Sequence, residues 1–242
     1  MSKTFRFSRD IPVEQAYDVV VAGGGPAGSA AAICAARLGA RVLLVEATGC
    51  LGGMGTSGLV TAFDPMADGQ TMLVGGFMRE VVEAMHERGF LAPHVTPEFW
   101  RQKFHCWTPF NSEGLKLLLD ELAVAAGVEV LFHTRVIDAE ANPKSRRVDG
   151  VVLHNIEGCR YVPAGAFIDA TGDAVLADLC GVSCREAGHN GPEAMPPTLC
   201  SLCAGIDWET AKAGPESNGP RDQQQLLERA IADGHFSHRD RH

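Results

Sequence analysis

Apolar runs and small-residue segments alternate along the N-terminal part of the chain. The run YDVVVA at residues 17–22 leads into the glycine-rich stretch AGGGPAG and then into the alanine-rich segment SAAAICAARLG. A second apolar run, ARVLLVE, ends at Glu46. Unbroken apolar runs are typical of parallel strands that are covered on both faces. Residues 17–46 therefore predict a strand, a tight turn, a helix and a second strand.

The pattern beyond Glu46 predicts further helices and strands. Periodicity is lost over residues 48–76, which indicates a loop with short helical pieces. Helical spacing returns at residues 77–89, and a second helix over residues 111–127 has a polar start and a terminal glycine. Segments 128–140, 147–155 and 160–170 are predicted strands, and a polar helix is expected over residues 221–232.

These elements place the chain in the α/β class. We expect a Rossmann-like domain with a parallel sheet, a small antiparallel β ribbon beside it, and an inserted substrate or cap region. Residues 1–60 and 111–185 are assigned to the nucleotide-binding domain, and residues 61–110 and 186–242 to the substrate or cap region.

Composition and charge narrow the functional classes. The chain has 242 residues, 45% of them hydrophobic, which is enough for a sizeable core. A formal net charge of -9 with scattered basic residues argues against a nucleic-acid partner. No apolar run is long enough for a membrane span, and the N-terminal segment lacks the apolar centre of a signal peptide, so a cytoplasmic location is expected.

The glycines after the first predicted strand carry the strongest chemical signal. Gly23, Gly25 and Gly28 match G-x-G-x-x-G. In this motif the first glycine allows the tight turn, the second lets the backbone approach a pyrophosphate, and the third lets helix and strand pack closely. A glycine-rich turn needed only for packing is the alternative.

Glu46 supports the nucleotide-binding interpretation. It ends the second predicted strand. In dinucleotide-binding folds, a carboxylate about 20 residues after the glycines accepts hydrogen bonds from the ribose hydroxyls, and Glu46 lies close to that separation in sequence. The same carboxylate should repel a 2′-phosphate, which disfavours NADP. A P-loop is excluded because no Lys-Ser/Thr pair follows the glycines.

A second glycine cluster decides between NAD and FAD. Residues 46–58 read EATGCLGGMGTSG, and a simple NAD fold has no use for these glycines. Together with DVVVAGGGPAGSAAAICAARLGARVLLVE and IDATGDA at residues 168–174, the chain resembles FAD-dependent oxidoreductases of the glutathione reductase and fumarate reductase superfamily. The resemblance extends from Tyr17 to about Asp207.

The resemblance implies FAD as cofactor and a set of residues that bind it. The first glycine turn would hold the pyrophosphate, Glu46 the adenosine ribose, and the loop of residues 52–56 would run beside the flavin. The backbone of Val136 would meet the adenine, and the ATGD segment would pack against the first turn. The full set is Gly23, Gly25, Pro26, Ala27, Gly28, Glu46, Gly52, Gly53, Met54, Gly55, Thr56, Val136, Thr171, Gly172 and Asp173.

Other candidate residues have plainer explanations. Cys200 and Cys203 have C-x-x-C spacing, but their surroundings read as an apolar strand and no second pair lies at zinc-site distance. They are expected to pack as small hydrophobes, and no metal is predicted. His105 and His189 lie in irregular segments, where surface or structural roles are commoner than catalytic ones. An aromatic cluster at Phe99, Trp100, Phe104, Trp107 and Phe110 could wall a flavin cavity or form ordinary core.

The expected function is an FAD-dependent oxidoreductase that passes a hydride or electron pair between a small organic substrate and the flavin. An NAD-binding dehydrogenase and a non-catalytic flavin-binding fragment remain alternatives. Members of the resembled family are longer, and their chain returns to the first domain after the substrate region. Nothing after Asp207 fits that description, so the chain is expected to be partial, with a C-terminal half or a homo-oligomer as a possible partner. The sequence assigns no catalytic residue.

Overall fold

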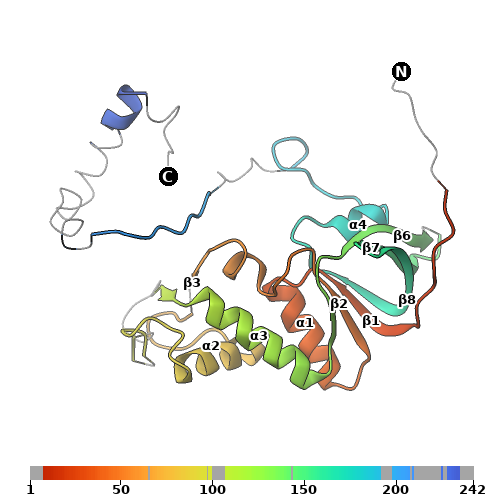
Figure 1. The fold of residues 1–242 in the computed structure, drawn as a ribbon, viewed down its shortest axis with the longest axis horizontal. Coiled ribbons are helices and arrows are strands. Elements are labelled where there is room, and N and C mark those ends of the chain that lie inside the picture. Colours follow the sequence, from red (N-terminus) through yellow and green to blue (C-terminus); the bar gives the residue numbers. More distant parts are fainter. Residues whose placement is uncertain are drawn as a thin grey trace. The chain divides into compact units, whose positions relative to one another are not determined.

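The structure is a computed structural model that describes residues 8–64, 66–96, 98–99, 107–142, 144–191, 198–207, 209, 225 and 228–234. The chain divides into two compact units, residues 1–186 and residues 187–242. The first unit holds all the named helices and strands (Figure 1). In the second unit, residues 225 and 228–232 are helical, which confirms the described part of the helix expected at 221–232.

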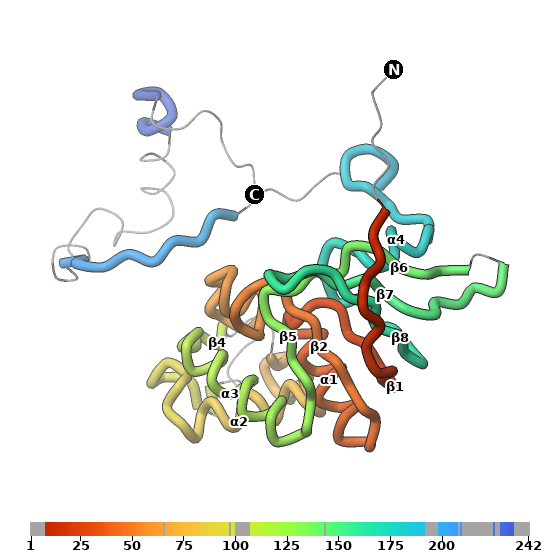
Figure 2. Tube along the Cα trace, turned by 45° about the vertical axis from the view of Figure 1, so that its right-hand side comes forward, coloured from red at the N-terminus to blue at the C-terminus, as the bar shows by residue number. Residues whose placement is uncertain are grey.

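The first unit is built on a sheet of six strands in the order β5-β2-β1-β8-β7-β6 (Figure 2). Strands β5, β2, β1 and β8 run parallel, and β8, β7 and β6 pair antiparallel. The strands are β1 (Tyr17–Ala22), β2 (Val42–Val45), β5 (Glu129–Leu131), β6 (Arg135–Asn142), β7 (Arg147–Asn155) and β8 (Gly158–Asp169). A separate two-stranded antiparallel sheet joins β3 (Ala62–Phe63) to β4 (Thr108–Pro109).

The first three named helices form where the sequence pattern predicts them, and the fourth was not predicted. They are α1 (Pro26–Arg37), α2 (Gly76–Glu87), α3 (Ser112–Ala126) and the short α4 (Val175–Leu179). The Asn111 side chain accepts hydrogen bonds from the first backbone N–H groups of α3, and Gly127 ends that helix with a left-handed φ of 75°. The expected α/β fold with a parallel sheet and an antiparallel ribbon is thus confirmed.

Alternate residues of the central strands pack into two cores on the two faces of the sheet. Val21 and Leu44 belong to the core shared with α1, α2 and α3. Val20 and Leu43 belong to the core that includes β7, β8 and α4. Figure 1 shows the first three helices grouped together and α4 beside β6 and β7. The apolar runs are therefore continuous because both of their faces are covered.

One strand predicted from the sequence is divided into two in the structure. Residues 128–140 were expected to form one strand, but the chain turns at His133, where φ is 50°, and separates β5 from β6. The His133 N–H donates to the carbonyl of Thr48 at 3.0 Å, and the Thr134 N–H donates to the carbonyl of Glu46 at 3.0 Å. The turn lets the chain leave β2 and pair with β7 instead. The pattern of apolar residues contains no sign of that change of neighbour.

The antiparallel ribbon is joined to the main sheet through one long strand. Residues 158–163 of β8 pair with β7, and residues 164–169 of the same strand pair with β1. The second half of β8 ends beside the end of β1, so the loop that follows Asp169 lies at the carboxyl edge of the parallel strands. Ligands of open α/β sheets bind at that edge.

Candidate functional site: a dinucleotide cradle

The turn between β1 and α1 is packed tightly at two of its glycines. A Cβ atom on Gly23 would lie 2.4 Å from the carbonyl oxygen of Ala170, and Gly23 has a φ of +96°. A Cβ atom on Gly28 would lie 1.7 Å from the carbonyl oxygen of Gly23. These contacts bring β1, α1 and the loop after β8 together at distances that only glycine permits.

Gly25 differs because it faces open space. A Cβ atom there would meet no heavy atom within 4 Å. Gly25 is the N-cap of α1, and no side chain forms a capping hydrogen bond there. Pro26 follows it at the start of the helix. No acidic residue lies among the first helical residues of α1. Helix amides in this position favour an anion such as a phosphate.

The Glu46 carboxylate connects this turn to the end of β2. Glu46 is only 7% exposed. Its Oε2 accepts a hydrogen bond from the Gly24 N–H at 2.7 Å, and its Oε1 accepts from the Thr48 N–H at 2.6 Å and the Thr48 hydroxyl at 2.7 Å. The carboxylate therefore holds the first glycine turn against the segment that follows β2. Sequence reasoning did not identify Gly24 or Thr48, and the only available signal was a hydroxyl residue two positions after the acid.

A second glycine loop lies against the first turn. It contains the 3-10 helix η1 (Gly53–Gly55), and Gly52 and Gly53 have left-handed φ values of 100° and 50°. The Gly52 N–H donates to the carbonyl of Gly24 at 2.9 Å, and a Cβ on Gly53 would lie 2.9 Å from the Cα of Gly25. The two glycine loops thus touch at Gly25, Gly52 and Gly53, which sequence analysis assigned to the cofactor, and at Gly24, which it did not.

Thr56 and Met54 of this second loop have different surroundings. Thr56 is fully buried, and its hydroxyl donates to the carbonyl of Leu51 at 2.7 Å. Met54 is 63% exposed. Thr56 therefore shapes the loop from inside, whereas Met54 presents an apolar side chain at its surface.

We use the word cradle for the glycine turn of residues 23–28, the second glycine loop of residues 52–56 and the segment of residues 170–174 after β8. This last segment is the third part of the cradle. The Ala170 N–H donates to the carbonyl of Ala22 at 2.8 Å, which fixes the segment against the end of β1. Asp169 accepts from the N–H and hydroxyl of Thr171 at 3.0 and 2.8 Å and from the N–H of Ala177 in α4 at 2.8 Å. Burial raises the pKa of Asp169, but these hydrogen bonds outweigh it and hold the pKa below its usual value.

The remaining residues of this segment follow from its geometry. Gly172 has a φ of +82°, and Ala174, the N-cap of α4, has a φ of 56°. Asp173 lies between them and is exposed. Two left-handed residues so close together turn the chain sharply from β8 into α4.

Val136 lies apart from the glycine loops. It is in β6, pairs with Leu153 of β7, and its side chain is 8% exposed in the core on the β7 side. The nearest link to the cradle is the hydrogen bond from Thr134 to the carbonyl of Glu46. Glu46 is thus hydrogen-bonded to the residue that directly precedes β6 and lies two positions before Val136.

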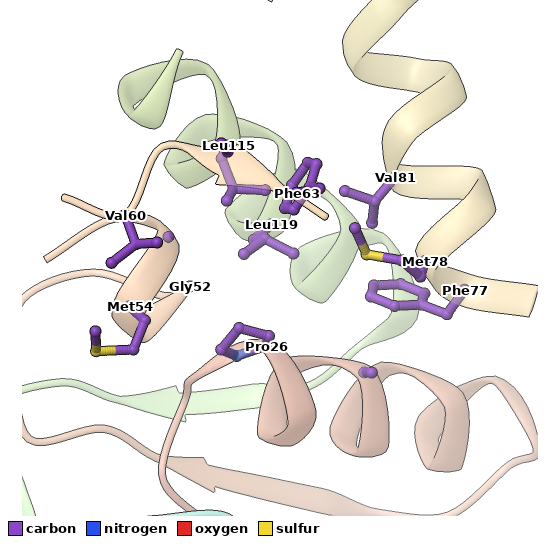
Figure 3. Close-up of a pocket in the computed structure, with 13 residues that line it drawn as sticks. Pro26, Gly52, Met54, Val60, Phe63, Phe77, Met78, Val81, Leu115 and Leu119 are labelled. Atoms are coloured by element: carbon purple, nitrogen blue, oxygen red, sulfur yellow. The ribbon is translucent and has the colours of Figure 1, made fainter. Parts of the chain in front are cut away.

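A cavity of about 240 Å³ opens beside the second glycine loop. In Figure 3, Phe63, Met78, Val81 and Leu119 surround it, and Pro26 at the start of α1 closes another side. Sequence analysis did not identify this cavity. The helical periodicity of residues 77–89 indicated a buried face but not a gap in its packing.

Several candidate residues do not join the cradle. The strand expected around Cys200 and Cys203 was wrong, because residues 198–204 form neither helix nor strand, and Cys203 is exposed. His189 is exposed in a turn. His105, Trp100 and Phe104 lie outside the described residues. Within the described part of the chain, no group of three or more His, Cys, Asp or Glu side chains could hold a metal ion.

The aromatic cluster is divided in the structure. Phe110 is buried and stacks on Phe63 with ring centroids 4.1 Å apart. Phe99 packs against the same core, and Trp107 is 61% exposed. The two phenylalanines of the cluster that the structure describes therefore contribute to the core.

Comparison with known families agrees with the geometry of the cradle. Residues 18–241 match the FAD dependent oxidoreductase family. The chain belongs to this family. Its cofactor is FAD, and its members are flavoproteins of the oxidoreductase class.

Individual relatives match over shorter lengths. A dihydrolipoyl dehydrogenase from Trypanosoma brucei brucei is 55% identical over 47 residues, which are 19% of this chain and 10% of that protein. Among solved structures, THI4 of Thermovibrio ammonificans has 20% identity and a TM-score of 0.47, covering 69% of this chain and 64% of that one. Glycine oxidase from Geobacillus kaustophilus has 17% identity and a TM-score of 0.48, covering 70% and 60%. The chain thus spans less than two thirds of each of these relatives.

The described residues of this family member fit a dinucleotide at the first turn. Gly25 leaves space at the start of α1, where a diphosphate needs close approach to backbone amides. The Glu46 carboxylate lies at the end of the neighbouring strand, on the same edge of the sheet. Among the described residues, no helix is long and apolar enough to cross a membrane.

Proposed function

We propose that this chain binds FAD across the carboxyl edge of β1, β2 and β8 and serves an oxidoreductase reaction on a small organic substrate. Gly23, Gly25 and Gly28 with Pro26 and Ala27 form the pyrophosphate site. Gly52, Gly53, Met54, Gly55 and Thr56 run beside the flavin. The observation that carries the proposal is the open space at Gly25, directly at the uncapped start of α1.

Glu46 and Thr48 hold the adenosine ribose together in this proposal. A carboxylate has about four acceptor positions, and three of those on Glu46 are used by Gly24 and Thr48. One position is left for a ribose hydroxyl. The Thr48 hydroxyl oxygen retains acceptor capacity for the other. Sharing the ribose between the two residues replaces the simpler expectation that Glu46 alone accepts both hydroxyls.

The remaining cofactor residues act through the backbone. The segment Thr171, Gly172 and Asp173 borders the cradle beside the first turn, since the N–H of Ala170 donates a hydrogen bond to the carbonyl of Ala22. The backbone at Val136 meets the adenine, on the strand that continues from the hydrogen bond between Thr134 and Glu46. The Val136 assignment extends the cradle toward the adenosine end of the cofactor. Thr171, Gly172 and Asp173 follow β8, on the other side of β1 from Glu46.

Bound FAD supplies two-electron redox chemistry, by which a hydride or electron pair passes between substrate and flavin. The chain orients the dinucleotide through rigid glycine loops and places apolar residues beside the flavin. Residues 61–110 and 186–242 contribute the substrate or cap region. A further segment or a partner, which can be a second copy, covers the remaining side of the flavin and excludes water there.

Identification of the bound dinucleotide tests this proposal. The purified chain is denatured, and the released nucleotide is identified by its absorption spectrum and by chromatography. Release of FAD is the expected result. Release of a nicotinamide nucleotide without flavin, or failure of added FAD to bind, would overturn it.

A further inference from the structure

The cavity beside the second glycine loop has a uniform chemical character. Its volume is about 240 Å³. All the described residues that line it are apolar, and they come from the start of α1, the loop of residues 52–63, α2 and α3. No described residue at its wall carries a charge, hydroxyl or amide side chain.

The walls of the cavity are held in place from outside. Both terminal nitrogens of Arg37 in α1 donate to the carboxylate of Glu80 in α2 at 2.7 Å. This bidentate pair joins the two helices at their surface. Phe63 is fixed by its stacking on Phe110. Contacts outside the cavity therefore join the elements that form its walls.

The rim of the cavity is also ordered by hydrogen bonds. The Val60 N–H donates to the carbonyl of Met54 at 2.9 Å, and the Gly58 N–H donates to the carbonyl of Gly53 at 3.0 Å. Leu59 is held at a φ of 58°, a conformation that a bulky residue adopts only when its surroundings impose it. Met54 and Val60 remain 63% and 37% exposed. The opening thus carries apolar side chains and lies beside the loop assigned to the flavin.

We propose that this cavity binds an uncharged apolar group of the substrate, an aromatic ring or alkyl chain of about six to ten carbon atoms. An apolar cavity of roughly 150 Å³ accepts benzene in another protein, and this cavity is larger. A charged or strongly polar group would lose its hydration without gaining a hydrogen bond from the described lining. The assignment of the ligand as substrate rests on the proposed flavin function, whereas the binding of an apolar ring does not.

Toluene is a direct probe of the cavity. The full chain is labelled at its methionine methyl groups, and toluene is titrated by NMR with and without saturating FAD. The resonances of Met54 and Met78, which line the cavity, are expected to shift. Met85 is fully buried in the same helix as Met78 but does not line the cavity, so its resonance is expected to shift less.

Filling the cavity should remove this binding. Ala30 lines it from α1, and Ala30→Leu is expected to weaken toluene binding at least tenfold. Ala62→Leu in β3 is a second filling variant for the case that the first does not fold. Ala125→Leu on the exposed surface of α3 is the matched control and should bind toluene like the wild type.

Three results would overturn the proposal. Unshifted Met54 and Met78 resonances would show that no apolar ring enters. Unchanged affinity in a folded filling variant would place the toluene elsewhere. Loss of toluene binding on addition of FAD would assign the cavity to the cofactor. If FAD does not bind while toluene does, the flavin proposal fails and the apolar site remains.

Discussion

The two glycine loops at the edge of the sheet use the same residue for different purposes. In the first turn, Gly23 and Gly28 are enclosed by backbone atoms that no side chain movement can displace. In the second loop, Gly53 also lies close to the backbone of Gly25, but a Cβ on Gly55 would meet only side-chain atoms, at 3.1 Å from Leu115 and 3.3 Å from Phe110. The first turn is packed against backbone atoms, whereas Gly55 in the second loop lines the cavity and contacts side chains that can move.

This difference explains why the two loops do separate work in one site. In the proposed FAD site, the tightly packed first turn would position the helix N-terminus for the diphosphate with little loss of order on binding. A loop beside a cavity can present apolar residues such as Met54 to a flat ring and still hold its shape through its own hydrogen bonds. Glu46 joins the two regions, because it binds Gly24 of the first turn and Thr48 ahead of the second loop.

The largest effect should follow from adding a methyl group to the first turn. Gly28→Ala would place a Cβ 1.7 Å from the carbonyl oxygen of Gly23, so helix and strand must separate. We expect a loss of about 3 kcal/mol or more in the free energy of unfolding. Gly55→Ala is the matched change in the second loop, where Leu115 can move, and its cost should stay below about 1 kcal/mol. Chemical denaturation of both variants measures the contrast, and equal losses would remove the distinction between the two loops.

The next largest effect concerns the carboxylate that joins the loops. Glu46→Ala leaves the buried Gly24 N–H without its partner, which costs roughly 1–3 kcal/mol of stability. It also removes a charge-assisted bond to the ribose of about 1.5–3 kcal/mol, so FAD affinity should fall at least about tenfold. Denaturation and FAD titration measure the two effects separately. Glu46→Gln is the control that keeps the side-chain volume and should lose less stability. Undiminished FAD affinity in the alanine variant would mean that the ribose is held elsewhere.

A third change should affect FAD binding without affecting the fold. Gly25 has a φ of −64°, which any residue can adopt, and no heavy atom lies near its missing Cβ. Gly25→Val should therefore unfold at nearly the same denaturant concentration as the wild type. Its side chain would occupy the space assigned to the diphosphate, and FAD affinity should fall at least about tenfold, or about 1.4 kcal/mol. A folded Gly25→Val chain that binds FAD normally would contradict the assignment of the pyrophosphate site.

The sequence predicted the parts of this molecule whose residues are constrained locally. The β-α-β unit at residues 17–46 follows from apolar runs and glycine spacing, and the cap of α3 follows from Asn111 and Gly127. The turn at His133 could not be predicted, because it depends on hydrogen bonds to Thr48 and Glu46, far away in the sequence.

The cavity was hidden for a related reason. It is a gap between α1, α2, α3 and the loop of residues 52–63, and the spacing of these elements depends on contacts between residues far apart in the sequence, such as Arg37 and Glu80, rather than on any local pattern. The same limit applies to Cys200 and Cys203, whose apolar neighbours suggested a strand that did not form. Leu199 and Leu202 beside them are exposed. An apolar segment forms a strand only where a partner strand is present, and composition alone does not show whether one is.

The smallest predicted effect is a pH dependence at the loop that closes the first turn. The pKa of Asp169 is lowered in the folded protein, because hydrogen bonds from Ala177 and Thr171 outweigh the opposing effect of burial. Its contribution to stability is therefore complete above the unfolded-state pKa of about 3.9 and is lost as the pH falls through the lower folded-state pKa. Asp169→Asn cannot offer a charged acceptor to both partners, so its stability should change less than that of the wild type between about pH 5 and pH 3. Denaturant titrations across this range measure the difference, with Asp10→Asn at an exposed position as the control. If the wild type and Asp169→Asn lose stability in parallel, the Asp169 carboxylate does not stabilise the segment after β8. The position of that segment against the first turn would then depend on the backbone hydrogen bond from Ala170 to Ala22 alone.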